Sequence, residues 1–179
     1  SLGAIQKIID RVSKAIEPYY QAIGKSARNS KINCIDETSW KKNGMLMYLW
    51  TMTSSYTAFF KIHKERSKEA FLALIEDWKG ILISDGYNVY QKWVNLRQTC
   101  LAHLIRHAKG LSEHPRRDIR EFGEKICEKL QQLCSMAKNI PTEQEWNDFY
   151  VGFIDLVFDH CNRFCKDEAG IFARRLLKE

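Results

Sequence analysis

The sequence predicts an α/β protein with a mixed five-stranded sheet, followed by a C-terminal part made only of helices. Strand-like and helical runs alternate in the order β-β-β-α-β-α-β from residue 31 to about residue 101. A helix at residues 67–78 precedes the fourth strand, so this strand can return parallel to the first. After about residue 102, apolar residues recur only at helical spacing. We therefore expect a three-strand meander plus two parallel strands, with flanking helices.

Composition narrows the class of protein before any motif is considered. The chain has 179 residues, of which 45% are hydrophobic, enough for one domain, or one domain with a large insertion. A net charge of +6 favours a polyanionic partner. An apolar run of about 18 residues is absent, so we expect no membrane association. Six cysteines without a CxxC pair predict reduced, buried thiols in a cytoplasmic protein.

The first predicted element is an amphipathic helix at residues 4–23. Its apolar positions recur at helical spacing: Ile5, Ile8, Ile9, Val12, Ile16, Tyr19 and Ile23. Gly24 is expected to end it, and Lys25 to Ser30 form a polar linker. The chain begins at Ser1 without a methionine, so we expect it to be a piece of a longer protein.

The meander follows the linker. Strand character begins at Lys31, and Asn43-Gly44 is a strong turn signal after this first strand. Met45–Thr53 and Tyr56–His63 are rich in β-branched and aromatic residues, which predicts a hairpin closed at Ser54-Ser55.

The crossover helix and the parallel strands come next. Ser67 can cap a helix at residues 67–78, with Gly80 as its end. Its core face is expected to hold Phe71, Leu74, Ile75 and Trp78. The apolar run after Gly80 leads into Asp85, and a short helix near 89–93 and a short strand near 98–101 complete the sheet.

Two long amphipathic helices are predicted in the C-terminal part. The first carries the stripe Ile119, Phe122, Ile126, Leu130, Leu133 and Ala137. Thr142 with Glu145 three residues later forms a capping box that opens the second. Its apolar side is expected to hold Trp146, Phe149, Tyr150, Phe153, Val157 and Cys161.

Two acidic motifs carry most of the functional information. Asp36-Glu37-Thr38 and Ser84-Asp85-Gly86-Tyr87 each follow a strand-like run. A carboxylate at the end of a buried strand is costly unless a cation or hydrogen bonds compensate it. Asp36 and Asp85 could hold a divalent metal, whereas Glu37 points to the other face of its strand and is a poorer ligand. Alternatively, Asp36 is a turn residue and Asp85 begins an Asp-Gly turn.

Four ordered blocks resemble the insertion-sequence 66 family of bacterial transposases. Asp36-Glu37-Thr38 with Trp40 and Trp50 resembles that family's first catalytic block, and His63 with Arg66 resembles the next. Ser84-Asp85-Gly86-Tyr87 with Tyr90 resembles the second acidic block. The run from Arg97 to Arg106, with Cys100, Ala102 and His103, resembles the block that follows. Together the blocks span residues 31–107.

This resemblance implies an RNase H-like fold and a DDE-type mechanism, a Mg²⁺-dependent (or Mn²⁺-dependent) DNA strand transfer. Asp36 and Asp85 match the first two acids of the triad and would be its catalytic and metal-binding residues. The third acid of the family lies in an Asn-Asn-x-x-Glu-Arg-type segment, which is absent here. Asp167-Glu168 does not match it, so we expect the third acid beyond the chain end.

The same resemblance suggests a division of the chain. Residues 1–30 would be an N-terminal helix and linker, and residues 31–111 the RNase H-like core. Residues 112–179 would be an all-helical insertion between the second and third acids, whose apolar faces could contact a second protomer.

Cys100-x-x-His103-x-x-x-His107 has two interpretations. With Cys161 or Cys165 it could form a zinc site. We favour the alternative, in which Cys100 packs in the sheet and His103 lies near the acids, because no second ligand pair has zinc-finger spacing. The resemblance likewise suggests that His103 lies near the active site or its DNA.

Basic and aromatic residues near the acids predict contacts with DNA. The residues expected to bind it are Arg66, Tyr87, Arg97, His103, Arg106, His107 and Lys109. Tyr87, Tyr90 or Trp93 could stack on an unpaired base, although packing is the simpler interpretation for Trp93. Trp40, Trp50, Trp78 and Trp146 are expected in the core. The alternative for the charges is an ordinary solvated surface.

The resulting prediction is the catalytic-core fragment of a DNA transposase, a polynucleotidyl transferase. It would act on transposon ends and target DNA as a homo-oligomer in the bacterial cytoplasm, near the nucleoid. The alternatives are a DNA-binding remnant without catalysis, a nuclease of the same fold that cuts without joining strands, and, more distantly, a zinc-structured interaction module.

Overall fold

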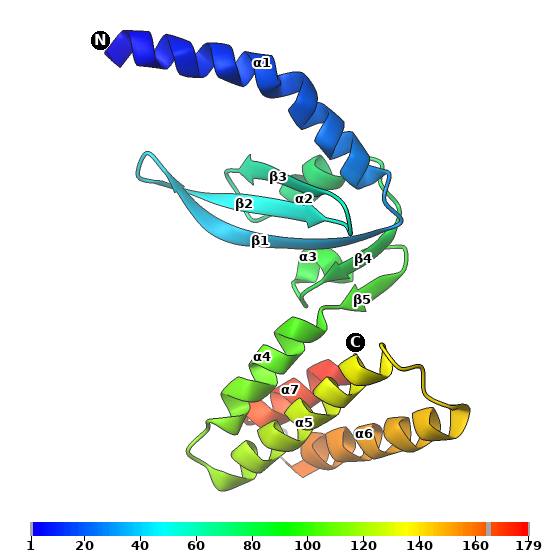
Figure 1. Cartoon of the computed structure of the whole chain (residues 1–179). Coiled ribbons are helices and arrows are strands. Elements are labelled where there is room, and N and C mark those ends of the chain that lie inside the picture. The colour runs from blue at the N-terminus through cyan, green and yellow to red at the C-terminus, as the bar shows by residue number, and fades with distance from the viewer. Residues whose placement is uncertain (1, 164–165, 179) are drawn as a thin grey trace. The chain divides into compact units, whose positions relative to one another are not determined.

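The computed structural model describes residues 2–163 and 166–178 (Figure 1). The chain divides into two compact units, Ser1–Gln98 and Thr99–Glu179, and each is described by itself. The sequence placed a division after residue 111, whereas the helix at residues 101–112 is grouped with the C-terminal helices. The functional division of the chain stays a prediction.

The first unit contains the sheet. Its strands are β1 (Ile32–Lys42), β2 (Met45–Thr53), β3 (Ala58–His63), β4 (Ile81–Ser84) and β5 (Arg97–Thr99). Within the described residues they form one five-stranded sheet in the order β3-β2-β1-β4-β5. β1 and β3 each pair antiparallel with β2, and β1 pairs parallel with β4. The structure thus confirms the RNase H-like mixed sheet, with its meander and its parallel strands.

The β1–β2 connection follows the predicted turn. Asn43 and Gly44 have φ angles of 51° and 77°, and two successive left-handed residues are typical of a type I′ turn. The pairing runs from Lys42↔Met45 to Cys34↔Thr53. β1 is much longer than expected, because it passes through Asp36 and ends only at Lys42. Asp36 therefore lies within the strand, not at its end.

One face of the sheet is covered by helices. Ile35, Trp50, Met52 and Phe59 point to this face and are at most 2% exposed. They pack with side chains of α2 (Lys68–Ile75) and α3 (Asn88–Gln91), including Phe71, Leu74, Ile75 and Tyr90. Strand alternation places Asp36 on the opposite face, where its neighbours in β1 are exposed.

α2 begins as predicted but ends earlier. The Ser67 side chain accepts a hydrogen bond from the backbone N–H of Ala70, which confirms the N-cap. The helix ends at Ile75 and not at Gly80, because Glu76 takes a left-handed φ of 52° and its N–H donates to the Leu72 carbonyl. Trp78 lies beyond the helix, 5% exposed, and its indole N–H donates to the Ser30 carbonyl.

α1 (Leu2–Arg28) is longer than the predicted helix. Gly24 does not end it, and the expected linker from Lys25 is helical as far as Arg28. Gly24 is buried, and a Cβ atom there would lie 3.0 Å from the Phe59 ring. The glycine therefore serves close packing of the helix on β3.

The second unit contains four helices among its described residues: α4 (Leu101–Ser112), α5 (Arg117–Met136), α6 (Glu143–Arg163) and α7 (Glu168–Leu176). Their shared core confirms Ile119, Phe122, Ile126 and Leu130 of the α5 stripe and Val157 of the α6 stripe, and it adds Leu104 and Phe172. Ala137 of the first predicted stripe and Tyr150 of the second are exposed, against the expectation. The capping box also forms, since the Thr142 N–H donates to Glu145 and the Thr142 hydroxyl accepts from the Glu145 N–H.

Four tryptophans were expected in the core, and two of them are buried there. Trp50 and Trp78 are buried, at 0% and 5% exposure, but Trp40 and Trp146 are 45% and 43% exposed. Trp40 is exposed because it lies on the face of β1 that no described helix of this unit covers. Trp146 lies in the first turns of α6 and stacks on Phe149.

Candidate active site

Asp36 lies where β1 loses its parallel neighbour. β1 pairs with β4 only from Ile32↔Ile81 to Cys34↔Ile83, while its pairing with β2 continues past Asp36. The Thr51 hydroxyl donates to the Asp36 carbonyl, and the Asp36 carboxylate accepts from the Glu37 N–H at 2.9 Å. The Asp36 side chain is exposed, beside the edge of β1 that faces β4.

Asp85 directly follows β4. Continuing the parallel register two residues past Cys34↔Ile83 sets Asp85 opposite Asp36, and adjacent strands lie about 4.8 Å apart. The Asp85 Oδ1 accepts from the Tyr87 N–H at 2.9 Å, which fixes the turn after the strand. Both carboxylates also raise the pKa of the Tyr90 hydroxyl electrostatically, so both lie near that group.

Glu37 points to the opposite face from Asp36. Its side chain is 1% exposed and forms an ion pair with Arg66, whose Nε lies 2.5 Å from Oε1. The Tyr90 hydroxyl donates to Oε2 of the same carboxylate. Glu37 was expected to be a poor metal ligand beside Asp36. The structure gives a reason, since both oxygens of its carboxylate already accept hydrogen bonds from Arg66 and Tyr90.

Burial dominates the protonation of this cluster. It raises the pKa of Glu37, and the hydrogen bonds from Tyr90 and Arg66 oppose this only in part. Burial also raises the pKa of Tyr90, together with its bond to Glu37. For Arg66, burial would lower the pKa, but the hydrogen bond and charge of Glu37 outweigh it and raise the value. Tyr90 and Arg66 therefore remain protonated as donors.

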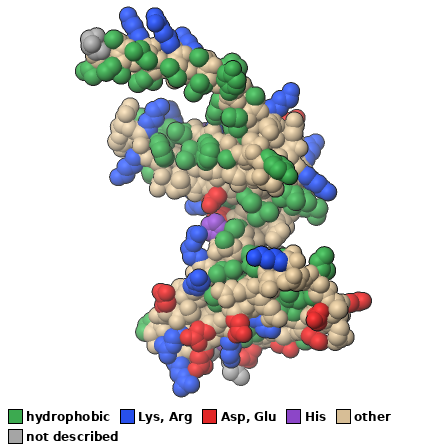
Figure 2. Space-filling model, viewed as in Figure 1, with side chains coloured by type: hydrophobic (Ala, Val, Ile, Leu, Met, Phe, Trp, Pro, Cys, Tyr) green, Lys and Arg blue, Asp and Glu red, His purple; other side chains and the backbone are tan. Residues whose placement is uncertain are grey.

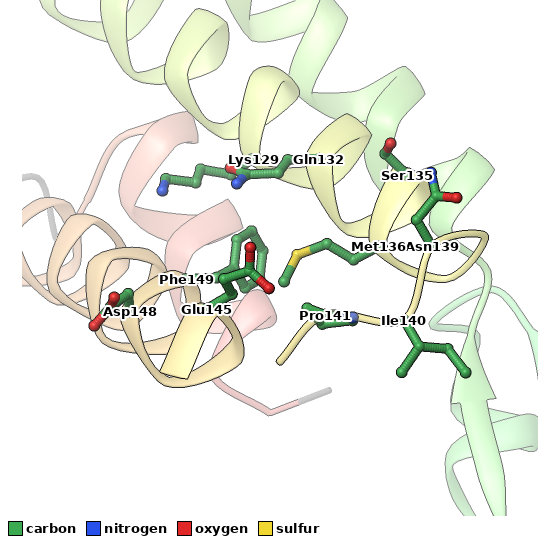
Figure 3. A pocket seen from close by; sticks show the side chains of 10 residues that line it. All are labelled: Lys129, Gln132, Ser135, Met136, Asn139, Ile140, Pro141, Glu145, Asp148 and Phe149. Atoms are coloured by element: carbon green, nitrogen blue, oxygen red, sulfur yellow. The ribbon is translucent and has the colours of Figure 1, made fainter. Parts of the chain in front are cut away.

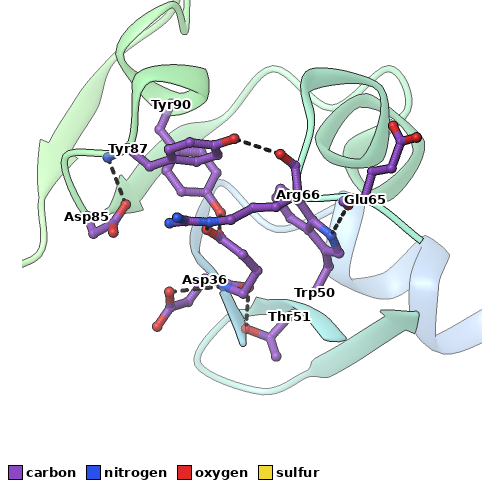
Figure 4. Close-up of polar contacts among 9 residues, drawn as sticks. Asp36, Trp50, Thr51, Glu65, Arg66, Asp85, Tyr87 and Tyr90 are labelled. Atoms are coloured by element: carbon purple, nitrogen blue, oxygen red, sulfur yellow. Dashed lines mark hydrogen bonds and ion pairs between the residues drawn. The ribbon is translucent and has the colours of Figure 1, made fainter. Parts of the chain in front are cut away.

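Arg66 and Tyr87 contact each other through a cation–π interaction and a hydrogen bond (Figure 4). The Arg66 guanidinium carbon lies 4.0 Å from the centre of the Tyr87 ring. The Tyr87 hydroxyl donates to the Arg66 carbonyl at 2.8 Å. Asp85 acts electrostatically on Arg66, so this cation also neighbours the second acid. Sequence reasoning named both residues separately but gave no sign that they touch.

The remaining residues expected to bind DNA lie on β5 and α4. Arg97 is half-buried on β5. On α4, Leu104, Ala108 and Leu111 face the helical core, while Arg106 and Lys109 are exposed and His103 is half-buried. His107 packs against Phe172 with ring centres 4.2 Å apart, and burial, aided by the charge of Arg175, lowers its pKa.

The three aromatic residues that were considered for stacking on a base have different environments. Tyr90 is 0% exposed and packs edge-on against Trp50 and Phe71, so the expectation that it could stack on a base is wrong. Trp93 stacks on Trp78 with ring centres 5.5 Å apart, which confirms the packing interpretation. Tyr87 is half-buried, with one ring face taken by Arg66.

The zinc site, which the sequence left as the less favoured interpretation, does not form among the described residues. No three His, Cys, Asp or Glu side chains in this part of the chain lie together as a metal site. Cys100 caps α4 by position and is half-buried, and Cys165 lies outside the described residues. The described cysteines form no disulfide, and none is fully buried: Cys34 is exposed and the others are half-buried, against the expectation of buried thiols.

The second unit has a cavity of its own (Figure 3). It has a volume of about 640 Å³ and lies between α5 and α6. Its walls include Lys129, Met136, Pro141, Asp148 and Phe149, and the Lys129 ammonium lies 5.3 Å from the centre of the Phe149 ring. None of the residues that the sequence singled out for catalysis or DNA binding lines it.

Comparison with known proteins identifies the family. The model described as "Transposase IS66 family" matches residues 1–149, which include both acids and the whole sheet. The chain belongs to this transposase family. No curated protein and no solved structure matches the chain significantly. Among the described residues of this transposase chain, no helix is long and apolar enough to cross a membrane.

Proposed function

We propose that this IS66-family chain forms part of the catalytic core of a DDE-type polynucleotidyl transferase, with Asp36 and Asp85 as its metal-binding acids. The reaction is hydrolysis of a phosphodiester at a transposon end, followed by attack of the freed 3′-hydroxyl on target DNA. The family supplies the reaction class, and DNA is the substrate that a transposase acts on.

The matched register of the two acids is the observation that supports this role best. Asp36 lies within β1 and Asp85 directly after β4, each two positions past the last paired residues of these parallel strands, Cys34 and Ile83. Ligands of α/β sheets gather near such positions, where parallel strands end at their carboxyl side. Two carboxylates brought close together there would repel each other unless a cation neutralises them.

The two acids fit Mg²⁺ or Mn²⁺. Mg²⁺ takes oxygen ligands and is commonly bound by one or two carboxylates, with water and substrate phosphate oxygens as the other ligands. When bound, the cation supplies Lewis acidity at the attacking and leaving oxygens.

The neighbouring residues position the acids. Glu37 is tied to Arg66 and Tyr90 on the covered face, and this fixes β1 at the residue that follows Asp36. Asp85 is fixed by the Tyr87 N–H, and Tyr87 by Arg66. Arg66 is the cation nearest this cluster that the structure identifies, and its exposed side offers a contact for a DNA phosphate.

DNA is held, in this proposal, by the basic residues after the second acid. Arg97, His103, Arg106, His107 and Lys109 would contact phosphates or orient the reacting strand. A third acid would complete the triad in this proposal.

A second function has one observation in its favour. Asp36 and Asp85 are not joined by a third carboxylate in the described residues, because Glu37 is engaged elsewhere. This arrangement also suits a DNA-binding chain without catalysis. The two proposals differ in whether the acids bind a cation at all.

Mn²⁺ titration of the purified chain tests the site directly. Electron paramagnetic resonance reports free Mn²⁺, and we expect Asp36→Asn and Asp85→Asn each to weaken binding at least tenfold. Asp155→Asn is the matched control, since this exposed aspartate lies on α6 in the other unit. Equal binding by wild type and both variants would sink the catalytic proposal and favour the DNA-binding chain.

Product analysis with the enzyme from its complete gene separates transposase from nuclease. Labelled transposon-end DNA should give both a nicked product and a joined product with target DNA, and both should vanish in Asp85→Asn. Nicks without joined products would identify the nuclease alternative.

A further inference from the structure

Most of α1 does not pack against the rest of the described chain. Every residue from Leu2 to Tyr19 is exposed, and the helix is held to the sheet only by its C-terminal part. There the Tyr20 hydroxyl donates to the Phe60 carbonyl, and Gly24 and Ala27 are buried. An isolated helical segment of this length is marginal in water without tertiary contacts. We therefore expect the exposed segment of α1 to be stabilised by packing against a binding partner.

Apart from Ile8, which lies beside them, the exposed large apolar side chains of α1 recur at alternating spacings of three and four residues. They form one stripe, called here the α1 stripe: Leu2, Ile5, Ile9, Val12, Ile16, Tyr19 and Ile23. Their exposure runs from 44% at Ile23 to 87% at Leu2. An average spacing of 3.5 residues is the seam of a coiled coil, whereas a helix lying on a globular core shows a broader face. Figure 2 shows hydrophobic side chains following this helix.

The charges of α1 all lie away from the stripe. The positions that flank it in the heptad are occupied by Gln6, Ile8, Ser13, Ala15, Tyr20 and Ala22. The charged residues occupy the outer heptad positions: Lys7, Asp10, Arg11, Lys14, Glu17, Lys25 and Arg28. Pro18 is also at an outer heptad position, so its ring faces away from the stripe, although a proline inside a helix removes a backbone hydrogen bond and bends the axis. The face that packs on the sheet, at Tyr20, Gly24 and Ala27, leaves the stripe clear.

We propose that the α1 stripe pairs with the α1 stripe of a second copy of this chain in a coiled coil. Identical stripes match layer by layer, and the uncharged flanks bring no like charges together. The apolar stripe runs from Leu2 to Ile23 and exposes on the order of several hundred Å², and contiguous apolar patches of this size often mark an interaction site. DNA is a poor occupant, because the stripe holds no cation and the lysines point elsewhere.

The other described helices support this assignment by contrast. α5 has a comparable apolar stripe, but Ile119, Phe122, Ile126 and Leu130 are all at most 2% exposed. Exposure along the whole stripe thus distinguishes α1 from α5. The proposal does not depend on the metal site, and its test uses neither metal nor DNA.

Sedimentation equilibrium of the whole chain tests the pairing. We expect the wild type to self-associate and the double variant Ile9→Glu/Ile16→Glu to raise the dissociation constant at least tenfold, because it buries charge in the seam. The matched control Ala4→Glu/Gln21→Glu adds the same charge at outer positions and should leave association unchanged. Circular dichroism and the fluorescence of buried Trp50 show whether each variant is folded. If the Glu variant misfolds, Ile9→Asn/Ile16→Asn replaces it, with the same expectation.

Three results would overturn the proposal. One is a wild-type chain that stays monomeric at concentrations on the order of 100 μM. Another is association that both stripe variants leave unchanged, which would place the interface elsewhere. The third is a monomeric chain whose thermal stability falls in the stripe variants, which would show that the chain's own helices cover the stripe.

Discussion

Glu37 and Arg66, 29 residues apart, form an ion pair of unequal burial. The Arg66 Nε lies 2.5 Å from Glu37 Oε1, yet the Glu37 side chain is 1% exposed and the Arg66 side chain 43%. The carboxylate cannot turn to water if it loses its partner, whereas the guanidinium can. The two ends of the pair should therefore respond differently to substitution.

Arg66→Ala should destabilise the protein more than Glu37→Gln. The first leaves a buried carboxylate with one donor fewer and should lower the free energy of unfolding by about 2 kcal/mol. The second removes the buried charge and leaves Arg66 solvated, at a cost of about 1 kcal/mol or less. Urea unfolding followed by tryptophan fluorescence measures both. In the Glu37→Gln background, Arg66→Ala should cost little. An equal cost in both backgrounds would show that the pair contributes nothing.

Stability should fall with rising pH through the titration of Glu37. Its pKa is raised in the folded protein, first by burial, so the folded chain holds this proton more tightly than the unfolded chain. The contribution is fully present below the ordinary value of 4.5 and is lost as the pH rises through the raised pKa. The measurement is the free energy of unfolding of wild type minus that of Glu37→Gln, from about pH 4 to about pH 8.

The subtraction isolates Glu37. Asp118 and Glu145 have lowered pKa values, because of the Arg116 side chain and the Thr142 backbone respectively, and they act with the opposite sign at lower pH. They are present in both proteins and cancel. A difference that stays flat or rises with pH would contradict the assignment.

Tyr90→Phe should destabilise the protein while leaving its packing intact. The ring is 0% exposed against Trp50 and Phe71, and phenylalanine keeps these contacts. The lost hydroxyl is a donor to Glu37, and its removal should cost about 1–3 kcal/mol. Tyr56→Phe is the control, since Tyr56 is 98% exposed and should show no change. Equal unfolding midpoints for all three proteins would mean that this bond is not formed in solution.

Arg106→Gln should weaken DNA binding and its dependence on salt. Arg106 is exposed on α4, and the loss of one phosphate contact lowers the slope of log K against log salt by about 1. Lys125→Gln changes the same charge on α5, where no DNA contact is predicted, and should leave the slope unchanged. Fluorescence anisotropy at several salt concentrations gives both slopes. Identical slopes for Arg106→Gln and wild type would remove Arg106 from the DNA-binding surface.

Local signals predicted most of the fold. The Asn43-Gly44 turn, the Ser67 cap and the Thr142–Glu145 capping box each depend on residues a few positions apart, and all form as expected. The strand order also followed, because a helix between strands constrains their direction. The strands that carry Asp36 and precede Asp85 were expected to be neighbours for the same reason, and β1 does lie next to β4, although Asp36 lies inside β1 and not at its end.

Long-range contacts explain the misses. Gly24 was taken as a helix end, but its role is set by Phe59, 35 positions later in the sequence. Trp40 was placed in the core because tryptophan is usually buried, yet its side of β1 has no helix over it. The Glu37–Arg66 ion pair could not be predicted from any local sequence pattern. The two residues are 29 positions apart, and the folding of the sheet brings them together.

Gly80, at the start of the β1–β4 pairing, should not tolerate a larger side chain. It precedes β4, and a Cβ atom there would lie 2.4 Å from the Lys31 carbonyl oxygen and 2.6 Å from the Trp78 ring. The Lys31 carbonyl also accepts from the Ile81 N–H at 2.8 Å, at the start of the β1–β4 pairing. Gly80→Ala must therefore push β4 away from β1 or displace Trp78, at a cost of about 1–3 kcal/mol.

The same shift should reach the acids, because the β1–β4 register sets Asp36 opposite Asp85. We expect Gly80→Ala to weaken Mn²⁺ binding as well as to lower the urea midpoint. Gly110→Ala is the control: a Cβ atom there has no neighbour within 4 Å, and alanine should stabilise α4 by about 0.5–1 kcal/mol. If Gly80→Ala lost stability but kept wild-type Mn²⁺ affinity, the placement of the acids would not depend on how closely β4 approaches β1.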